Sequence, residues 1–240
     1  MGFETKYNKI LIFSIGLFLV GIFIGYNVNN IFINSYHKKD IIKKLDNNKY
    51  KLFVIAHQDE VDIKKFDIKL KIDKNIYLTN VGFLMYSGVG KLETTYNLTK
   101  FLLNYKNNIS DVFNIGTAGG TKNNQFGDIV ECNKFIQADF KIRNKVIKKK
   151  NMYLKKNNNY TCLSQDKFVL EAQQPQNVVF EMEAFANASV LQNFGMLDKF
   201  YSIKIISDIV GNNVYHDWDK DVKILNSILV DKIKEIAGSK

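Results

Sequence analysis

The chain has 240 residues, of which 46% are hydrophobic, and it contains a single proline. This composition suits one sizeable folded core with an appended segment, and it argues against a disordered chain or a loop-rich disulfide scaffold. The formal net charge of +10 comes almost wholly from lysine, which favours polyanions or anionic lipid as partners, although a solvated lysine-rich surface is the plainer interpretation.

The N-terminal part of the chain is predicted to be separate from the folded domain. No charged residue occurs from Ile10 to Tyr36, and the densely apolar stretch is at the short end for a membrane span and long for a signal-peptide core. It is apolar all round, which disfavours a buried core helix. We expect a short tail at 1–9, an uncleaved signal anchor or a cleaved signal peptide at 10–33, and a charged linker at 34–49. The protein is then exported, either membrane-anchored or periplasmic or extracellular.

Strand-like and helical patterns alternate through the rest of the chain, residues 50–240. Short apolar runs predict strands at 51–56, 81–90, 111–120, 127–132, 159–164, 177–180 and 201–208, with glycine turns ending the second and third. Helical periodicity predicts helices at 91–105, 183–195 and 219–238. The last helix carries an apolar stripe, formed by Val222, Leu225, Ile228, Leu229 and Ile233. This alternation predicts a single α/β domain with a central mixed, mostly parallel twisted sheet flanked by helices.

Polar residues follow six of the predicted strands. Ligands of such sheets bind beyond the carboxyl ends of the strands. One polar strand end alone would be a turn or a helix cap, and SGVGK lacks the spacing of a P-loop, but six in one series predict a ligand site. The six are His57–Glu60, Ser87–Lys91, Gly116–Gly120, Ser164–Phe168, Glu181–Glu183, and Ser207 with Asp208.

The two cysteines and three histidines do not extend this site. Cys132 and Cys162 have no CxxC spacing, and the histidines are scattered. Neither a zinc site nor a disulfide framework is predicted.

Three of these segments, VFNIGTAGG, FEMEAFANASV and IKIISDIVG, resemble in this order the 5′-methylthioadenosine/S-adenosylhomocysteine nucleosidases of the nucleoside phosphorylase-like superfamily. IAHQDEV, SGVGK, GDIVECNKFIQADF and SQDKFV fall where that family has its other motifs, so the resemblance covers about 51–236. It implies a homodimer that uses water to cleave 5′-methylthioadenosine, S-adenosylhomocysteine or 5′-deoxyadenosine, releasing adenine. No cofactor, metal or nucleic acid is expected.

The resemblance also implies roles for individual residues. Asp208 matches the general acid at N7 of adenine, Glu60 the glutamate that activates water, and Glu183 the glutamate that binds ribose hydroxyls and steadies the cationic sugar. The other residues expected at the substrate are Met182 on the ribose, Phe168 and Val169 at adenine, Thr117, Ala118 and Gly119 on the water and ribose side, Lys204 and Ser207 nearby, and His57 and Val89 at the 5′-alkylthio group.

Glu181 is interpreted differently, although it lies two residues from Glu183. Alternation along an extended chain points the two side chains in opposite directions. Because a buried carboxylate is costly without a partner, we expect Glu181 to be structural and bonded to backbone or to a lysine.

Several positions depart from the family pattern. Thr117 replaces a serine and keeps the hydroxyl, whereas Lys204 replaces an arginine and loses its planar fork. Gln165 and Lys167 stand where small residues are common. Basic residues follow ADF where the family tends to place apolar residues, so the preferred 5′ group stays open.

Two alternatives remain. A phosphorylase of the same superfamily would bind phosphate with arginines, but Arg143 is the only arginine and lies away from the glycine segments. An exported adhesin for polyanions such as glycosaminoglycans would use the basic run at 141–150, for which a solvated loop is the plainer interpretation.

Overall fold

The computed structural model describes residues 45, 47–140, 151–154, 160–167, 169, 176–210 and 218–238. The chain divides into two units, residues 1–47 and residues 48–240. The predicted tail and hydrophobic segment, Phe168 and the basic run at 141–150 all lie outside the described residues. No helix in the described part of the chain is long and apolar enough to cross a membrane.

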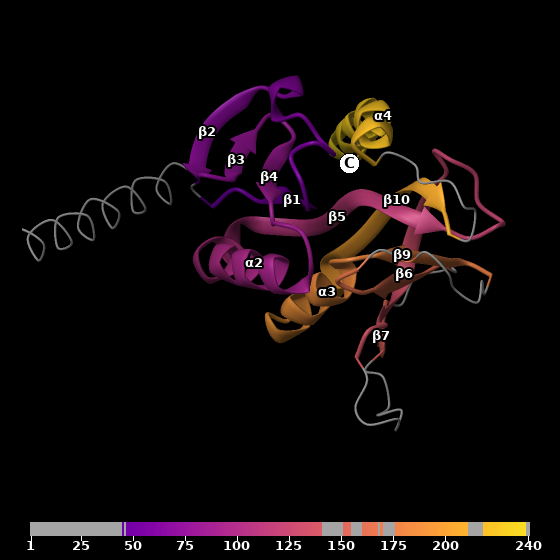
Figure 1. Cartoon of the computed structure of the whole chain (residues 1–240). Coiled ribbons are helices and arrows are strands. Elements are labelled where there is room, and N and C mark those ends of the chain that lie inside the picture. The colour runs from indigo at the N-terminus through magenta and orange to yellow at the C-terminus, as the bar shows by residue number, and fades with distance from the viewer. Residues whose placement is uncertain are drawn as a thin grey trace, which may run out of the picture. The chain divides into compact units, whose positions relative to one another are not determined.

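Ten strands form one sheet in this part of the chain (Figure 1). They are β1 (Tyr50–Ile55), β2 (Ile68–Asp73), β3 (Ile76–Thr79), β4 (Gly82–Tyr86), β5 (Ile109–Gly120), β6 (Ile129–Gln137), β7 (Asn151–Tyr153), β8 (Tyr160–Ser164), β9 (Val178–Glu181) and β10 (Phe200–Ile209).

The sheet is mixed, as predicted, but it is less parallel than expected. Strands β4, β1, β5 and β10 run parallel in that order, and β6, β8 and β9 form a second parallel set. The pairings β2–β3, β3–β4, β6–β7, β6–β10 and β5–β9 are antiparallel. The difference arises largely because the unpredicted strands β2 and β3 are joined to each other and to β4 by two-residue connections, which only antiparallel pairing allows. The unpredicted strand β7 adds one more antiparallel pair.

Strand β5 has three neighbours. It pairs with β1 and β10, and its last residues meet β9 where Gly119 lies opposite Phe180. The order β5–β10–β6–β8–β9 therefore returns to β5, and the sheet closes on itself around the end of that strand.

Helices lie on both sides of β5 and β10: α4 (Trp218–Gly238) on one side, and α2 (Lys91–Tyr105) and α3 (Ala184–Asn193) on the other (Figure 1). The predicted helical ranges agree with these three helices. Three short 3-10 helices, η1 (Ile63–Lys65), η2 (Lys106–Asn108) and η3 (Leu197–Lys199), complete the connections.

The core between α4 and the sheet follows the predicted apolar stripe with one exception. Leu225, Leu229 and Ile233 are fully buried and pack with Phe53 and other sheet residues. The prediction for Ile228 is wrong, because its side chain is 36% exposed. One residue turns the helix by about 100°, and this carries Ile228 off the stripe that Leu225 and Leu229 define.

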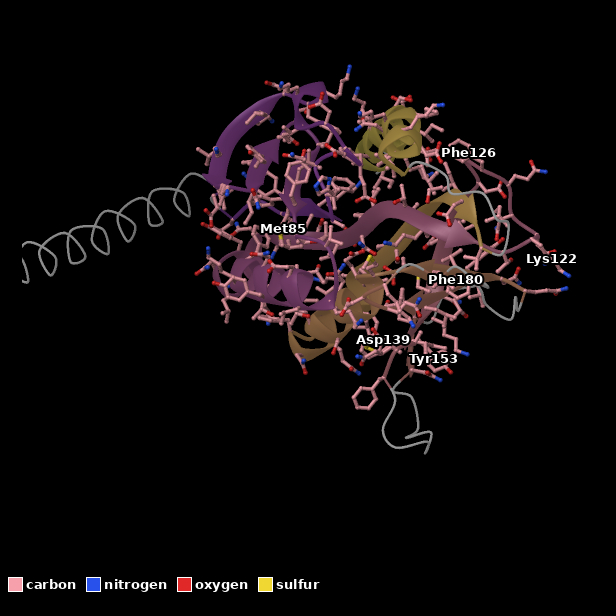
Figure 2. The ribbon with its side chains drawn as sticks, in the orientation of Figure 1. Met85, Lys122, Phe126, Asp139, Tyr153 and Phe180 are labelled. Atoms are coloured by element: carbon pink, nitrogen blue, oxygen red, sulfur yellow. The ribbon has the colours of Figure 1, made fainter. Side chains whose placement is uncertain are left out.

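Side chains of the sheet separate into buried and exposed sets (Figure 2). Met85 of β4 and Phe180 of β9 are buried, whereas Tyr153 of β7 is exposed, as is Phe126 in the turn between β5 and β6. Strand β4 is buried along most of its length, as is typical of a central strand covered on both faces.

Candidate active site

Glu60 is the buried carboxylate that follows β1. Its Oε1 accepts hydrogen bonds from the backbone N–H of Thr117, at 2.7 Å, and from the Thr117 hydroxyl, at 2.9 Å. Its Oε2 accepts from the backbone N–H of His57, at 3.3 Å. The side chain is 4% exposed in this setting, so the end of β1 and the far part of β5 fix its position together.

The GTAGG segment of β5 is strand, not the predicted turn. Its glycines do not have a positive φ; instead, they leave room for carboxylates. A Cβ on Gly116 would lie 2.8 Å from Oε1 of Glu60, and one on Gly119 would lie 3.1 Å from Oδ2 of Asp208. Glycine is therefore required here for close approach and not for a left-handed backbone.

SGVGK, in contrast, is a true turn. Gly88 and Gly90 have φ values of 85° and 87°, in the region that favours glycine. Gly90 directly precedes α2, and its N–H donates to Oε1 of Glu183 at 2.8 Å. The turn after β4 thus delivers a backbone donor to the residue that precedes α3.

Glu183 is 5% exposed. Burial raises the pKa of its carboxyl to about 8; the charge of Lys204 and the N–H of Gly90 oppose this shift, while the charges of Glu181 and Glu60 reinforce it. The raised pKa reflects a carboxyl placed where water does not solvate its charge. A cation at this position would favour the ionised form.

Glu181 is held by donors on both of its oxygens. Its Oε2 accepts from the backbone N–H groups of Glu183, at 2.9 Å, and Ala184, at 2.7 Å, at the start of α3. Its Oε1 accepts from the hydroxyl of Ser164, and Nζ of Lys204 lies 3.2 Å from Oε2. The prediction that Glu181 bonds to backbone or to a lysine is confirmed, because it does both.

Lys204 lies inside the sheet with 1% of its surface exposed. Burial alone would lower the pKa of its ammonium, but the charges of Glu181 and Glu183 raise it above the usual value. Lys204 is therefore a charged partner of both glutamates. The position of a lysine within the apolar run SIKII was the sequence signal for this burial.

Asp208 lies in β10, opposite Gly119 of β5, just after an irregularity in the register. The hydroxyl of Ser207 donates to Oδ1 of Asp208 at 2.8 Å, while Ser207 itself is 4% exposed. Because of this irregularity, the side chains of two successive residues, Ser207 and Asp208, both lie beside the last residues of β5.

The remaining predicted residues divide into three groups. Ala118 is buried and Met182 is half-buried between the two glutamates in sequence. Val169 packs against a small cluster with Phe180. His57 and Val89 are more open, with 40% of the His57 side chain and 47% of Val89 exposed.

Tyr86 is a residue near this site that the sequence analysis missed. Its hydroxyl donates to the carbonyl of Val61, at 2.7 Å, and accepts from the N–H of Ile63, at 3.1 Å. Burial raises the pKa of Tyr86 to about 12. The side chain thereby braces the segment that carries Glu60, and a tyrosine ending an apolar strand was the available signal.

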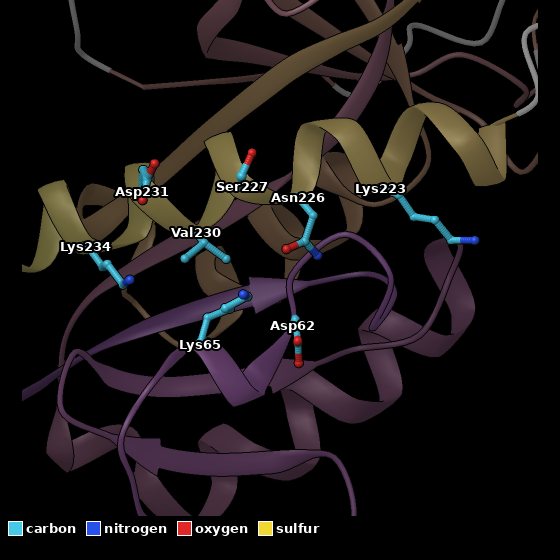
Figure 3. A pocket seen from close by; sticks show the side chains of 8 residues that line it. All are labelled: Asp62, Lys65, Lys223, Asn226, Ser227, Val230, Asp231 and Lys234. Atoms are coloured by element: carbon cyan, nitrogen blue, oxygen red, sulfur yellow. The ribbon is translucent and has the colours of Figure 1, made fainter.

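A pocket of about 520 Å³ lies elsewhere, between the η1 region and α4 (Figure 3). Asp62 and Lys65 line one side of it, and residues of α4, polar except for Val230, line the other. None of the predicted site residues lines this pocket, so the carboxylates around β5 remain the candidate site.

Solved structures share this fold. The 5′-methylthioadenosine/S-adenosylhomocysteine nucleosidase of Neisseria meningitidis, in complex with methylthio-immucillin-A, is 18% identical over 80% of this chain and 100% of that one, with a TM-score of 0.65. The corresponding Campylobacter jejuni nucleosidase is 16% identical over 80% and 100%, with a TM-score of 0.63. Futalosine hydrolase of Helicobacter pylori is 16% identical over 79% and 97%, also with a TM-score of 0.63. The chain therefore has the nucleoside phosphorylase-like fold of these enzymes.

No protein-family model and no curated protein matches the chain.

Proposed function

We propose that this protein is an N-ribosyl hydrolase that uses water to cleave the bond between adenine and ribose in a 5′-substituted adenosine. The observation that carries the proposal is the set of three carboxylates around the glycine-bearing end of β5. Glu60 bonds to Thr117, Asp208 lies against Gly119, and Glu183 follows β9, the strand that pairs with β5 at Gly119. Cleavage of an N-glycosidic bond needs a base for water, an acid for the leaving base, and charge to stabilise a cationic sugar.

Glu60 suits the role of base. Two N–H groups and one hydroxyl donate to its oxygens, and these bonds hold the carboxylate in one orientation. A positioned base within hydrogen-bond reach of water typically contributes about 100- to 10,000-fold to the rate.

Glu183 suits stabilisation of the sugar. Its burial weakens solvent screening, so its charge interacts strongly with a cation that forms nearby. Its raised pKa supports this role, because a developing positive charge favours the ionised form that burial disfavours.

Asp208 suits the role of acid at N7 of adenine. Ser207 donates to its Oδ1, which leaves Oδ2 as the oxygen facing Gly119. A proton on the carboxyl would then pass to the departing base.

The surroundings of the buried Lys204 favour water over phosphate as the nucleophile. Lys204 lies 3.2 Å from Glu181 and is 1% exposed, so its charge is already matched by a carboxylate. A phosphate dianion beside Glu60 and Glu183 would meet like charge. This argues against the phosphorylase alternative.

The preferred substrates are 5′-methylthioadenosine and S-adenosylhomocysteine, with 5′-deoxyadenosine as the third candidate. The test is release of the base from each nucleoside by the full-length protein, with and without phosphate, followed by absorbance and chromatography. Futalosine belongs in the panel because futalosine hydrolase has the same fold. Adenine released without phosphate supports the proposal, and no base released from any nucleoside contradicts it.

The proposed setting of the enzyme is a homodimer that is exported and held at a membrane by residues 10–33. Exposed apolar side chains on α2 and beside it support a second copy: Val89 is 47%, Leu92 80% and Tyr96 63% exposed. Light scattering tests the dimer, and carbonate extraction of membranes tests the anchor. Retention on heparin tests polyanion binding by the lysine-rich surface.

A further inference from the structure

Lys91, the first residue of α2, joins two aspartates from distant parts of the chain. Its Nζ lies 2.7 Å from Oδ2 of Asp139 and 2.9 Å from Oδ2 of Asp166. The three side chains also share backbone bonds, because the N–H of Lys91 donates to Oδ1 of Asp166 at 2.9 Å and the N–H of Asp166 donates to Asp139 at 3.0 Å. Asp139, labelled in Figure 2, follows β6, and Asp166 follows β8.

This cluster lies directly behind the glycine turn that bonds to Glu183. A Cβ on Gly90 would lie 3.1 Å from Oδ1 of Asp166, and the N–H of Gly90 donates to Glu183. On its other side Asp166 adjoins Gln165, whose N–H donates to the carbonyl of Glu181 at 2.9 Å. The segment after β8 is thus fixed at one point to β9 and at another to the start of α2.

The charges of the cluster support a maintained contact. The Lys91 side chain is 14% exposed and that of Asp139 is 26% exposed. Burial alone would lower the pKa of Lys91 and raise the pKa of Asp139. The hydrogen bonds between them outweigh burial: those to the aspartates raise the pKa of Lys91, and the bond from Lys91 lowers the pKa of Asp139. Ion pairs near a protein surface add little to stability, so joining three segments is the more informative property of this one.

We propose that Lys91, Asp139 and Asp166 form a positioning clamp that holds residues 165–167, which follow β8, against the start of α2. Because Val169, expected at the adenine base, comes two residues after this segment, the clamp sets where the base binds relative to Glu183. The proposal rests on the proposed nucleosidase function. None of the three side chains takes part in the chemical step. Loosening the clamp weakens binding of the nucleoside and of adenine, while the carboxylates that act on the sugar keep their own contacts.

Lys91→Met tests the clamp, with Lys91→Arg as the conservative variant. The matched control is Lys100→Met, which removes another ion pair of α2, at 2.9 Å from Asp73. We expect Lys91→Met to raise KM and the inhibition constant of adenine about tenfold, with kcat within about threefold. Lys91→Arg restores both constants to within a few-fold of wild type, and Lys100→Met leaves them unchanged. Unchanged binding constants in Lys91→Met, or a loss confined to kcat, would overturn the proposal.

A measurement that does not depend on activity separates the clamp from the proposed function. Amide hydrogen exchange in Lys91→Met is expected to accelerate at Asp166, whose N–H bonds to Asp139, and to stay unchanged at Ile203 in the core. Unchanged exchange at Asp166 overturns the clamp even if the enzyme is active. If exchange at Asp166 is faster in Lys91→Met but the wild-type protein releases no base from any nucleoside, the clamp is supported and the proposed nucleosidase activity is contradicted.

Discussion

Replacing each buried glutamate of the FEMEA segment with glutamine is expected to give opposite results. Glu183→Gln should lose turnover and keep stability, whereas Glu181→Gln should keep turnover and lose stability. The two residues are two positions apart and equally buried, each 5% exposed. The contrast therefore depends on their partners and not on their depth in the fold.

The expected loss in Glu183→Gln comes from the removed charge. The amide oxygen can still accept the N–H of Gly90, which lies 2.8 Å from the carboxylate, so the folded structure keeps this bond. Removing one preorganised electrostatic group typically lowers kcat by about 100- to 1,000-fold. KM should change less, because an amide still contacts a ribose hydroxyl.

The expected loss in Glu181→Gln is structural. The change leaves the buried ammonium of Lys204 without the carboxylate that lies 3.2 Å away, and breaking a buried ion pair costs about 3–5 kcal/mol. The amide oxygen of the glutamine can still accept from the N–H groups of Glu183 and Ala184, so the lower end of this range is expected. For a chain of this length about 3 kcal/mol corresponds to a fall in Tm of about 6–12 °C. Because the charge of Glu181 raises the pKa of Glu183, the same variant should move the acidic limb of the activity profile to lower pH.

The pH dependence of stability provides a further readout. The pKa of Glu183 is raised from its ordinary value of 4.5 to about 8. Below pH 4.5 the carboxyl is protonated in both states; as the pH rises from there through 8, the unfolded chain releases its proton more readily, so stability falls. Between pH 5 and pH 9 the Tm of wild type should therefore fall further than that of Glu183→Gln.

Thermal melts followed by circular dichroism and adenine release followed by absorbance check these outcomes. If Glu181→Gln abolishes turnover while Glu183→Gln is mild, the two assignments are reversed. If neither variant loses turnover, the nucleosidase proposal fails and polyanion binding becomes the better explanation of the protein.

Three further predictions concern other parts of the chain. Asp208→Asn should fold normally and lose about 100- to 10,000-fold in adenine release; a variant that keeps more than about a tenth of the activity would remove Asp208 from the role of acid. Gly116→Ala should displace Glu60, because the new Cβ would lie 2.8 Å from its Oε1, and should lower kcat, whereas Gly238→Ala, with nothing within 4 Å, is the control. Removal of residues 1–47 should leave a soluble, active unit, while the full chain pellets with membranes and resists carbonate; a full chain that stays in solution untrimmed would contradict the anchor.

Much of the site could be predicted because polar residues at the ends of strands are visible in the sequence. Glu60, Glu183 and Asp208 each follow an apolar run in the sequence, and the sheet brings Glu60 and Asp208 against β5. The three main helices followed from periodicity because each presents an apolar face to the sheet. Strand β2 was missed because IKLKID carries three charged residues and is mostly exposed, so it has little apolar signal.

Other features required three-dimensional contacts. A glycine needed for a turn and a glycine needed for close approach look the same in a sequence, and GTAGG was misinterpreted for that reason. Alternation separated Glu181 from Glu183, but it did not show that the charge of Lys204 acts on both. Ile228 was wrongly assigned to the buried stripe because it is next to Leu229, and successive residues of a helix point about 100° apart.

The three-sided pairing of β5 has a consequence for how the chain folds during synthesis. The partners β9 and β10 come from the last third of the sequence, so the long middle strand cannot complete its pairing until nearly the whole polypeptide has left the ribosome. Contacts between such distant segments form slowly, and until then the nascent chain exposes unpaired strand edges. If the N-terminal segment directs export, as proposed, this delay keeps the polypeptide extended while it is threaded through a translocation channel, and the three carboxylates come together only after crossing.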